Sequence, residues 1–227
     1  MSELGHRLLV GDGTRKAPQH ALALIVEAAK GGEPRALARL AALRAAGAYI
    51  RQDWDDALRL LGQAAAAGDA GARGQLIALQ PPGVAPAGWE EMASRVPLQQ
   101  WLQPAAQEHL HEKVRRVPGL APRPVCDWLI GRGHGLMQRA LVYDSVTRSN
   151  QVHEMRTNTM AQFGYANLDV VQLLVQARMA ATCGYPMQHF ESPMLLHYDV
   201  GEEIQSHFDF IDAQAHDYAQ QLAELGQ

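Results

Sequence analysis

Three side chains near the end of the sequence have the types and the spacing that metal-dependent chemistry needs. His207 and Asp209 are two residues apart, and Tyr198 precedes His207 by nine positions. They lie in the segment 193–212, PMLLHYDVGEEIQSHFDFID, which holds two β-like runs. Because side chains alternate along a strand, His207 and Asp209 are predicted to project from one face. An imidazole nitrogen and a carboxylate oxygen placed in this way can bind the same metal ion.

The turn between the two runs determines where Tyr198 lies. Gly201 and Glu202 separate MLLHYDV from EIQSHFDFI, and a two-residue turn there would place Tyr198 opposite Gln205. The phenol would then share the face of the His–Asp pair. Two alternatives stay open: the pair can be a surface pair on a half-exposed strand, and Tyr198 can be an ordinary sheet tyrosine.

The elements that must position these residues are short and mixed in type. A strong helix is predicted over VVQLLVQARMAATCG, with Asp169 as its N-cap and Gly184 as its stop. The remaining predicted elements are a short helix from Gln107, a short helix over 125–130 that ends at the glycines 131 and 133, and strands over 139–144 and 155–163.

Residues 1–80 carry an internal repeat with a period of 36 residues. The segments ALALIVEAAKGG and ALRLLGQAAAAG occupy equivalent positions in two successive units. Each unit is predicted to contain an Ala/Leu-rich helix, a glycine stop and a second helix, the latter over 34–46 and 70–79. Gly32 and Gly68 would supply the left-handed turn that ends the first helix of each unit.

Composition is typical of a soluble globular protein and argues against nucleic-acid-binding, disulfide-rich and membrane-spanning proteins. The chain is 47% hydrophobic and 19% charged, and its net charge of -4 gives no reason to expect a nucleic-acid partner. Cys126 and Cys183 are too few for a disulfide framework or a thiolate zinc site, which fits a reducing compartment. With no signal peptide recognised at the start and no membrane-length apolar run, we expect a cytoplasmic protein.

The repeat pattern, an apolar helix with paired alanines before a glycine, resembles Sel-like helical repeats, which are related to the tetratricopeptide repeat. The resemblance covers about residues 17–80. It implies an α-solenoid that either docks a protein or peptide partner or supports the next domain. Residues 81–106 are rich in proline and are expected to connect the two parts.

The second half resembles the prolyl 4-hydroxylase type of 2-oxoglutarate- and iron(II)-dependent dioxygenase. The resemblance runs over about 122–227 and rests on RPVCDWLI at 123–130, RTN at 156–158, GYP at 184–186 and ESPMLLHYDVGEEIQSHFDF at 191–210. It implies an α+β chain in which the helical repeats precede an incomplete double-stranded β-helix, or jelly roll, with flanking helices. The implied domains are residues 1–80, the linker 81–106 and the oxygenase part 107–227.

The resemblance also implies what the site residues do. His207 and Asp209 would be two of three iron ligands, and the Tyr198 hydroxyl would hydrogen-bond 2-oxoglutarate. The reaction would be hydroxylation of a C–H bond, with a protein or peptide as the expected substrate and proline as the family-typical target. Iron(II) and 2-oxoglutarate are the expected cofactor and co-substrate. The resemblance also makes ascorbate an expected further cofactor. Arg156 matches a strand arginine of the family, without an assigned role.

The sequence departs from the family pattern after Asp209. Only 18 residues follow it, and they hold no Lys or Arg that could pair with the distal carboxylate of 2-oxoglutarate. The one later histidine is His216, which we do not expect to be the third ligand. We therefore expect these residues to be the N-terminal part of a longer oxygenase, inactive when isolated.

Two other functions compete with the dioxygenase. The chain can be an interaction scaffold, in which the helical repeats bind a partner and the oxygenase half is degenerate. A weaker hypothesis is a zinc hydrolase that uses His197, His207 and His216, although alternation places His197 on the opposite face from Tyr198.

Overall fold

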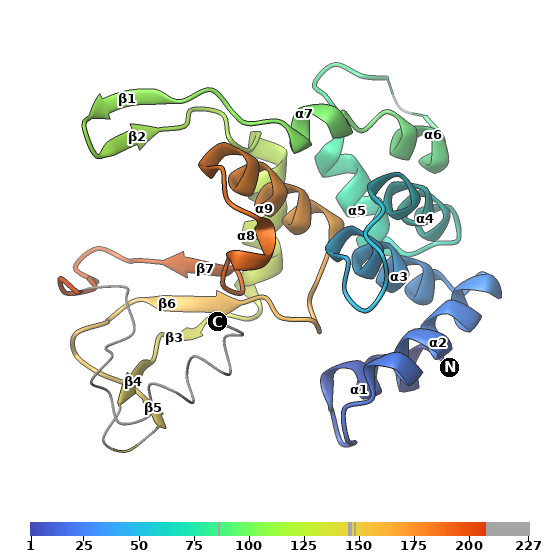
Figure 1. Ribbon diagram of the computed structural model, residues 1–227, viewed down its shortest axis with the longest axis horizontal. Helices are drawn as coiled ribbons and strands as arrows, with labels where there is room; N and C mark the ends of the chain where they lie inside the picture. The colour runs from blue at the N-terminus through green and yellow to red at the C-terminus, as the bar shows by residue number, and fades with distance from the viewer. Residues whose placement is uncertain (86, 145–146, 148, 208–227) are drawn as a thin grey trace. The chain divides into compact units, whose positions relative to one another are not determined.

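The computed structural model describes residues 1–85, 87–144, 147 and 149–207, and it is mixed α/β (Figure 1). Asp209 and His216 lie outside the described residues. The chain divides into two compact units. The first contains residues 1–132 and 163–193, and the second contains the described residues of 133–162 and 194–227.

Helices make up the beginning of the first unit. They are α1 (Ser2–Val10), α2 (Pro18–Lys30), α3 (Pro34–Ala46), α4 (Trp54–Ala66) and α5 (Ala70–Leu79). Helix α4 begins 36 residues after α2, and α5 begins 36 residues after α3. The predicted helices and their spacing are therefore confirmed. Their assignment to Sel-like repeats, and to a solenoid, stays a prediction.

Local sequence signals explain these helix ends. Gly32 and Gly68 have φ angles of 78° and 103°, the left-handed conformation that glycine adopts without steric cost. Asp53 caps α4, and its side chain accepts a hydrogen bond of 2.9 Å from the Asp56 backbone N–H. Alanines such as Ala21 and Ala57 are fully buried, so the helices pack closely on one another.

The proline-rich segment contains two short helices, α6 (Trp89–Ser94) and α7 (Leu98–Leu102). The helix predicted from Gln107 is wrong, since β1 (Glu108–His111) and β2 (Val114–Arg116) form an antiparallel hairpin there. A helix this short gains few internal hydrogen bonds for the dihedral angles it fixes, whereas a hairpin pairs the same backbone groups across a tight turn.

Helices α8 (Arg123–His134) and α9 (Val170–Cys183) follow, and a 3-10 turn, η1 (Met187–His189), comes after α9. The predicted cap is confirmed, because the Asp169 side chain accepts from the Gln172 backbone N–H at 2.7 Å. The predicted stop is also confirmed, with Gly184 left-handed at φ 75°. Helix α8 is longer than predicted and continues past both of its glycines.

Helix α5 holds α8 and α9 through specific contacts within the first unit. The side-chain oxygen of Gln75 accepts a 2.8 Å hydrogen bond from the Val170 backbone N–H at the start of α9. The Trp128 ring of α8 lies directly over Gly74, where no side chain separates it from the α5 backbone. Trp128 Nε1 in turn donates to Asp169 Oδ2 at 2.9 Å. These repeat helices therefore support the helices that follow them.

The second unit contains short antiparallel strands. Strands β3 (Gln138–Arg139), β6 (Thr159–Gln162) and β7 (Met194–His197) form one sheet in the order β3-β6-β7, and β4 (Val142–Asp144) pairs with β5 (Ser149–Gln151). The predicted strand 139–144 is thus two strands, and the predicted strand 155–163 is shorter. Among the described residues the strands form small sheets, and a jelly roll is not established.

The hairpin predicted around Gly201 and Glu202 is wrong. Strand β7 pairs with β6, and the residues after the turn pair further along the same neighbouring segment, with a bridge between Arg156 and Ile204. The Gln205 backbone N–H donates to the Met155 carbonyl at 2.9 Å, so Tyr198 does not lie opposite Gln205. Alternation predicts that a run is extended but does not identify the strand that will pair with it.

Within the described part of the chain, no helix is both long enough and apolar enough to cross a membrane.

Candidate metal and co-substrate site

His207 lines a pocket of about 310 Å³ in the second unit. The pocket wall also contains Arg156, the backbone-paired residues Met155, Ile204 and Gln205, and the apolar residues Leu141 and Val142. Its volume lies near the lower end of the range for small-molecule sites, roughly 300–1,000 Å³. The structure therefore brings together His207 and Arg156, which are far apart in the sequence.

Backbone pairing between residues 155–157 and 203–205 builds this pocket. The Thr157 backbone N–H donates to the Glu203 carbonyl at 2.9 Å, and the Glu203 backbone N–H donates to the Thr157 hydroxyl at 2.7 Å. These bonds fix the segment that leads to His207. The Thr157 hydroxyl thus accepts from the Glu203 backbone N–H, where a sheet would use a backbone carbonyl.

The imidazole of His207 has a defined orientation. Its Nδ1 lies 2.8 Å from the carbonyl oxygen of Gln205. A carbonyl can only accept, so Nδ1 is the donor in this contact. A backbone carbonyl that holds the other ring nitrogen is the usual support of a metal-binding histidine. His207 is exposed at the pocket surface.

Arg156 provides positive charge at the same place. Its Nε donates to the Asn158 side-chain oxygen at 3.1 Å, and Asn158 is fully buried. Arg156 also lines a second pocket of about 400 Å³, whose other lining residues include Gln138, Asn150 and Met160. A half-buried guanidinium beside an aligned imidazole suits an anionic ligand.

The other predicted site residues are less well placed by the structure. Tyr198, one residue beyond β7, is 39% exposed and does not line the His207 pocket. Asp209 lies outside the described residues, so its pairing with His207 stays a prediction. The proposed zinc trio includes His216, which lies outside the described residues; among the described residues His197 groups with Asp199 and Glu202.

Comparison with known proteins gives a partial match. The chain is 30% identical over 90 residues to a protein described as "Probable prolyl 4-hydroxylase 7" from Arabidopsis thaliana. The match supports a distant relationship to prolyl 4-hydroxylases. It covers 40% of this chain and spans 28% of the length of the curated relative. No family model matches the chain, and no solved structure matches it significantly.

The described residues fit an iron and 2-oxoglutarate site in part. The imidazole of His207 is held by a backbone carbonyl in the manner of a metal ligand, and the adjoining pocket contains a guanidinium that can attract a carboxylate. The donor set suits a first-row transition metal rather than calcium, because calcium prefers oxygen ligands alone.

Sequence reasoning identified His207 but missed two features of this region. Arg156 was noted without a role, because its place beside His207 depends on pairing between distant segments. The group His197, Asp199 and Glu202 was also missed, although His197 and Asp199 repeat the H-x-D spacing.

Proposed function

We propose that this chain carries part of the catalytic site of a 2-oxoglutarate- and iron(II)-dependent dioxygenase of the prolyl 4-hydroxylase type. The observation that carries the proposal is the pocket in which Arg156 adjoins an imidazole whose Nδ1 faces the Gln205 carbonyl. The distant prolyl 4-hydroxylase match supports the same chemistry.

In this proposal each residue has a limited task. His207 Nε2 and a carboxylate oxygen of Asp209 hold the metal ion, and the Nδ1–H of His207 keeps the ring in place. Arg156 attracts the anionic co-substrate into the pocket, and the Tyr198 hydroxyl donates a hydrogen bond to it. Bound iron supplies the redox chemistry that couples decarboxylation of 2-oxoglutarate to hydroxylation of a C–H bond.

We further propose that the substrate is a protein or peptide and that the helical unit helps to dock it. A groove of about 650 Å³ lies along α2, α3 and α4. Its lining combines apolar residues such as Leu37 and Leu40 with charges of both signs, among them Arg44 and Arg59, which pair with Asp56. Such a surface offers both apolar contact and hydrogen-bond donors to a peptide.

The same groove favours the scaffold as a second candidate function, since it could bind a partner without any chemistry in the other unit. A scaffold has no need of 2-oxoglutarate. Co-substrate binding therefore separates the two functions.

Isothermal titration of 2-oxoglutarate into the chain, with redox-inert Mn²⁺ in place of iron, tests the proposal. We expect metal-dependent binding that His207→Ala abolishes and that His189→Ala, a change at an exposed histidine of the other unit, leaves unchanged. Equal binding of 2-oxoglutarate by the wild-type chain and His207→Ala would remove His207 from the site. No metal-dependent binding by the wild-type chain would favour the scaffold.

A further inference from the structure

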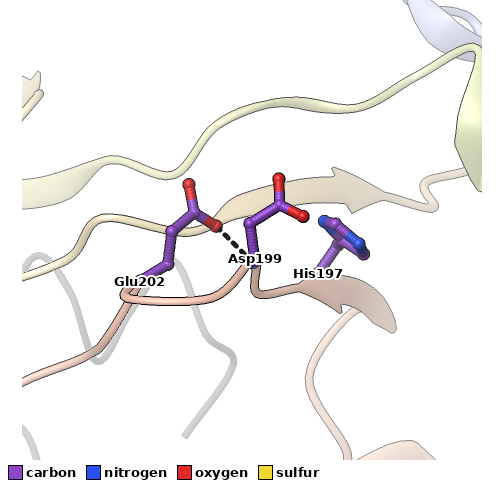
Figure 2. A group of neighbouring side chains, drawn as sticks. All are labelled: His197, Asp199 and Glu202. Carbon is purple, nitrogen blue, oxygen red and sulfur yellow. Dashed lines mark hydrogen bonds between the residues drawn. The ribbon is translucent and has the colours of Figure 1, made fainter.

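A second group of potential metal ligands lies at the end of β7 and in the turn that follows it. His197, Asp199 and Glu202 each offer one ligand atom, and these three atoms lie within 4.8 Å of one another. Figure 2 shows the two carboxylates and the imidazole side by side along this short segment. His207 does not belong to the group.

The backbone of the turn places these side chains together. His197 is the last residue of β7 and pairs with Thr159 of β6. Gly201 adopts a left-handed φ of 89°, which reverses the chain and brings Glu202 back toward Asp199. The Glu202 backbone N–H donates to the Asp199 carbonyl, and the Asp199 backbone N–H donates to Glu202 Oε2, each at 2.9 Å.

Among the described residues, no Lys or Arg pairs with the carboxylates of this group. Asp199 and Glu202 are two carboxylates in close proximity, and like charges at this distance repel each other. A bound cation would remove the repulsion and use the imidazole as a third ligand.

The donor set indicates the class of cation. One imidazole nitrogen with two carboxylate oxygens suits zinc, manganese and iron, whereas calcium and magnesium prefer oxygen ligands alone. Ligand atoms bound at roughly 2.1 Å from one ion lie at most about 4.2 Å apart, and rotation of these side chains can bring the three atoms within that limit. His197 and Asp199 are exposed, so water can complete the coordination.

We propose that His197, Asp199 and Glu202 bind a divalent first-row transition metal ion at a site separate from that of His207 and Asp209. The ion joins the end of β7 to the following turn. Because His197 and Asp199 are the two neighbours of Tyr198, the bound ion fixes the backbone on both sides of that tyrosine.

Zinc titration of the metal-free 227-residue chain tests this site, with the double variant His207→Ala/Asp209→Asn as the parent. The double variant removes the proposed iron ligands, so failure of the dioxygenase proposal does not affect the result. We expect the parent to bind one Zn²⁺ per chain. Adding His197→Ala should weaken binding by about tenfold or more.

Two further variants separate metal binding at this group from an effect on the turn and from binding at another histidine. Glu202→Gln removes the carboxylate charge but keeps an oxygen that can accept from the Asp199 N–H, so it should weaken zinc binding without loosening the turn. His189→Ala removes an exposed histidine elsewhere and should leave binding within about twofold of the parent. The proposal is overturned if the parent binds no zinc, or if His197→Ala and Glu202→Gln bind it as tightly as the parent does.

Discussion

Asp169 is a buried carboxylate that stabilises the packing of α8 against the start of α9. It is 4% exposed, caps α9 and accepts from Trp128 Nε1, and Arg132 Nε lies 3.3 Å from its Oδ2. Burial raises the pKa of the Asp169 carboxyl, while the hydrogen bonds from Gln172 and Trp128 oppose the rise. These contacts join α8 to the start of α9.

We expect Asp169→Ala to lower the free energy of unfolding by about 3 kcal/mol, because it leaves the Trp128 and Gln172 donors without their acceptor and the Arg132 guanidinium without its counter-charge. Denaturant unfolding measures the change. Asp127→Ala in α8 is the control, since its exposed pair with Arg123 contributes about 0.5 kcal/mol. Equal losses in the two variants would show that burial of Asp169 is unimportant.

Arg156 is expected to act through charge. Arg156→Gln should weaken 2-oxoglutarate binding about tenfold, the loss of one charge-assisted hydrogen bond of roughly 1.5 kcal/mol. Calorimetry in the presence of Mn²⁺ measures the affinity. Arg115→Gln makes the same charge change on the exposed β1–β2 hairpin and should have no effect. If both variants bind alike, Arg156 does not contact the co-substrate.

Among the elements, the contact between Gly133 at the end of α8 and Leu195 of β7 is sensitive to side-chain size. A Cβ added at Gly133 would overlap Leu195 Cδ2 of β7, and Ala161 of β6, which it would also contact, is fully buried. Leu195 and Ala161 are paired in register. Gly133 therefore allows the helix to approach the sheet closely.

Gly133→Ala should destabilise the chain by about 1–2 kcal/mol, because Leu195 must leave its preferred rotamer. Gly131→Ala in the same helix meets nothing within 4 Å and should stabilise by about 0.5–1 kcal/mol through helix propensity. Thermal or denaturant unfolding of the pair measures the difference. Stabilisation by both substitutions would contradict the close approach.

Local elements were predictable from the sequence, and pairing between distant segments was not. The helices of residues 18–79, the Asp169 cap and the Gly184 stop depend on neighbouring residues, so composition and spacing identify them. The segment from Gln107 forms a hairpin instead, and after the turn at Gly201 the chain pairs with residues 155–157, which precede β6, rather than with β7.

The candidate site also depends on pairing between distant segments, which could not be predicted from the sequence. Spacing identified His207 as a metal ligand candidate, but Arg156 lines the same pocket through pairing between residues 155–157 and 203–205, which spacing does not predict. A turn at Gly201 was predicted, but the type of turn, which brings Glu202 next to Asp199 and His197, was not.

At the scale of the whole molecule, the helical unit contains a groove of about 650 Å³ and the second unit contains the His207 pocket. The central claim is that His207 and Asp209 bind iron together with 2-oxoglutarate. Everything proposed about hydroxylation depends on that claim.

The most direct test is an anaerobic titration of the chain with ferrous iron and 2-oxoglutarate, followed by visible spectroscopy. The account predicts the charge-transfer band of a chelated iron–2-oxoglutarate complex, lost in His207→Ala and Asp209→Ala and retained in His189→Ala. A wild-type chain that shows no band, or a band that survives both ligand substitutions, would contradict it.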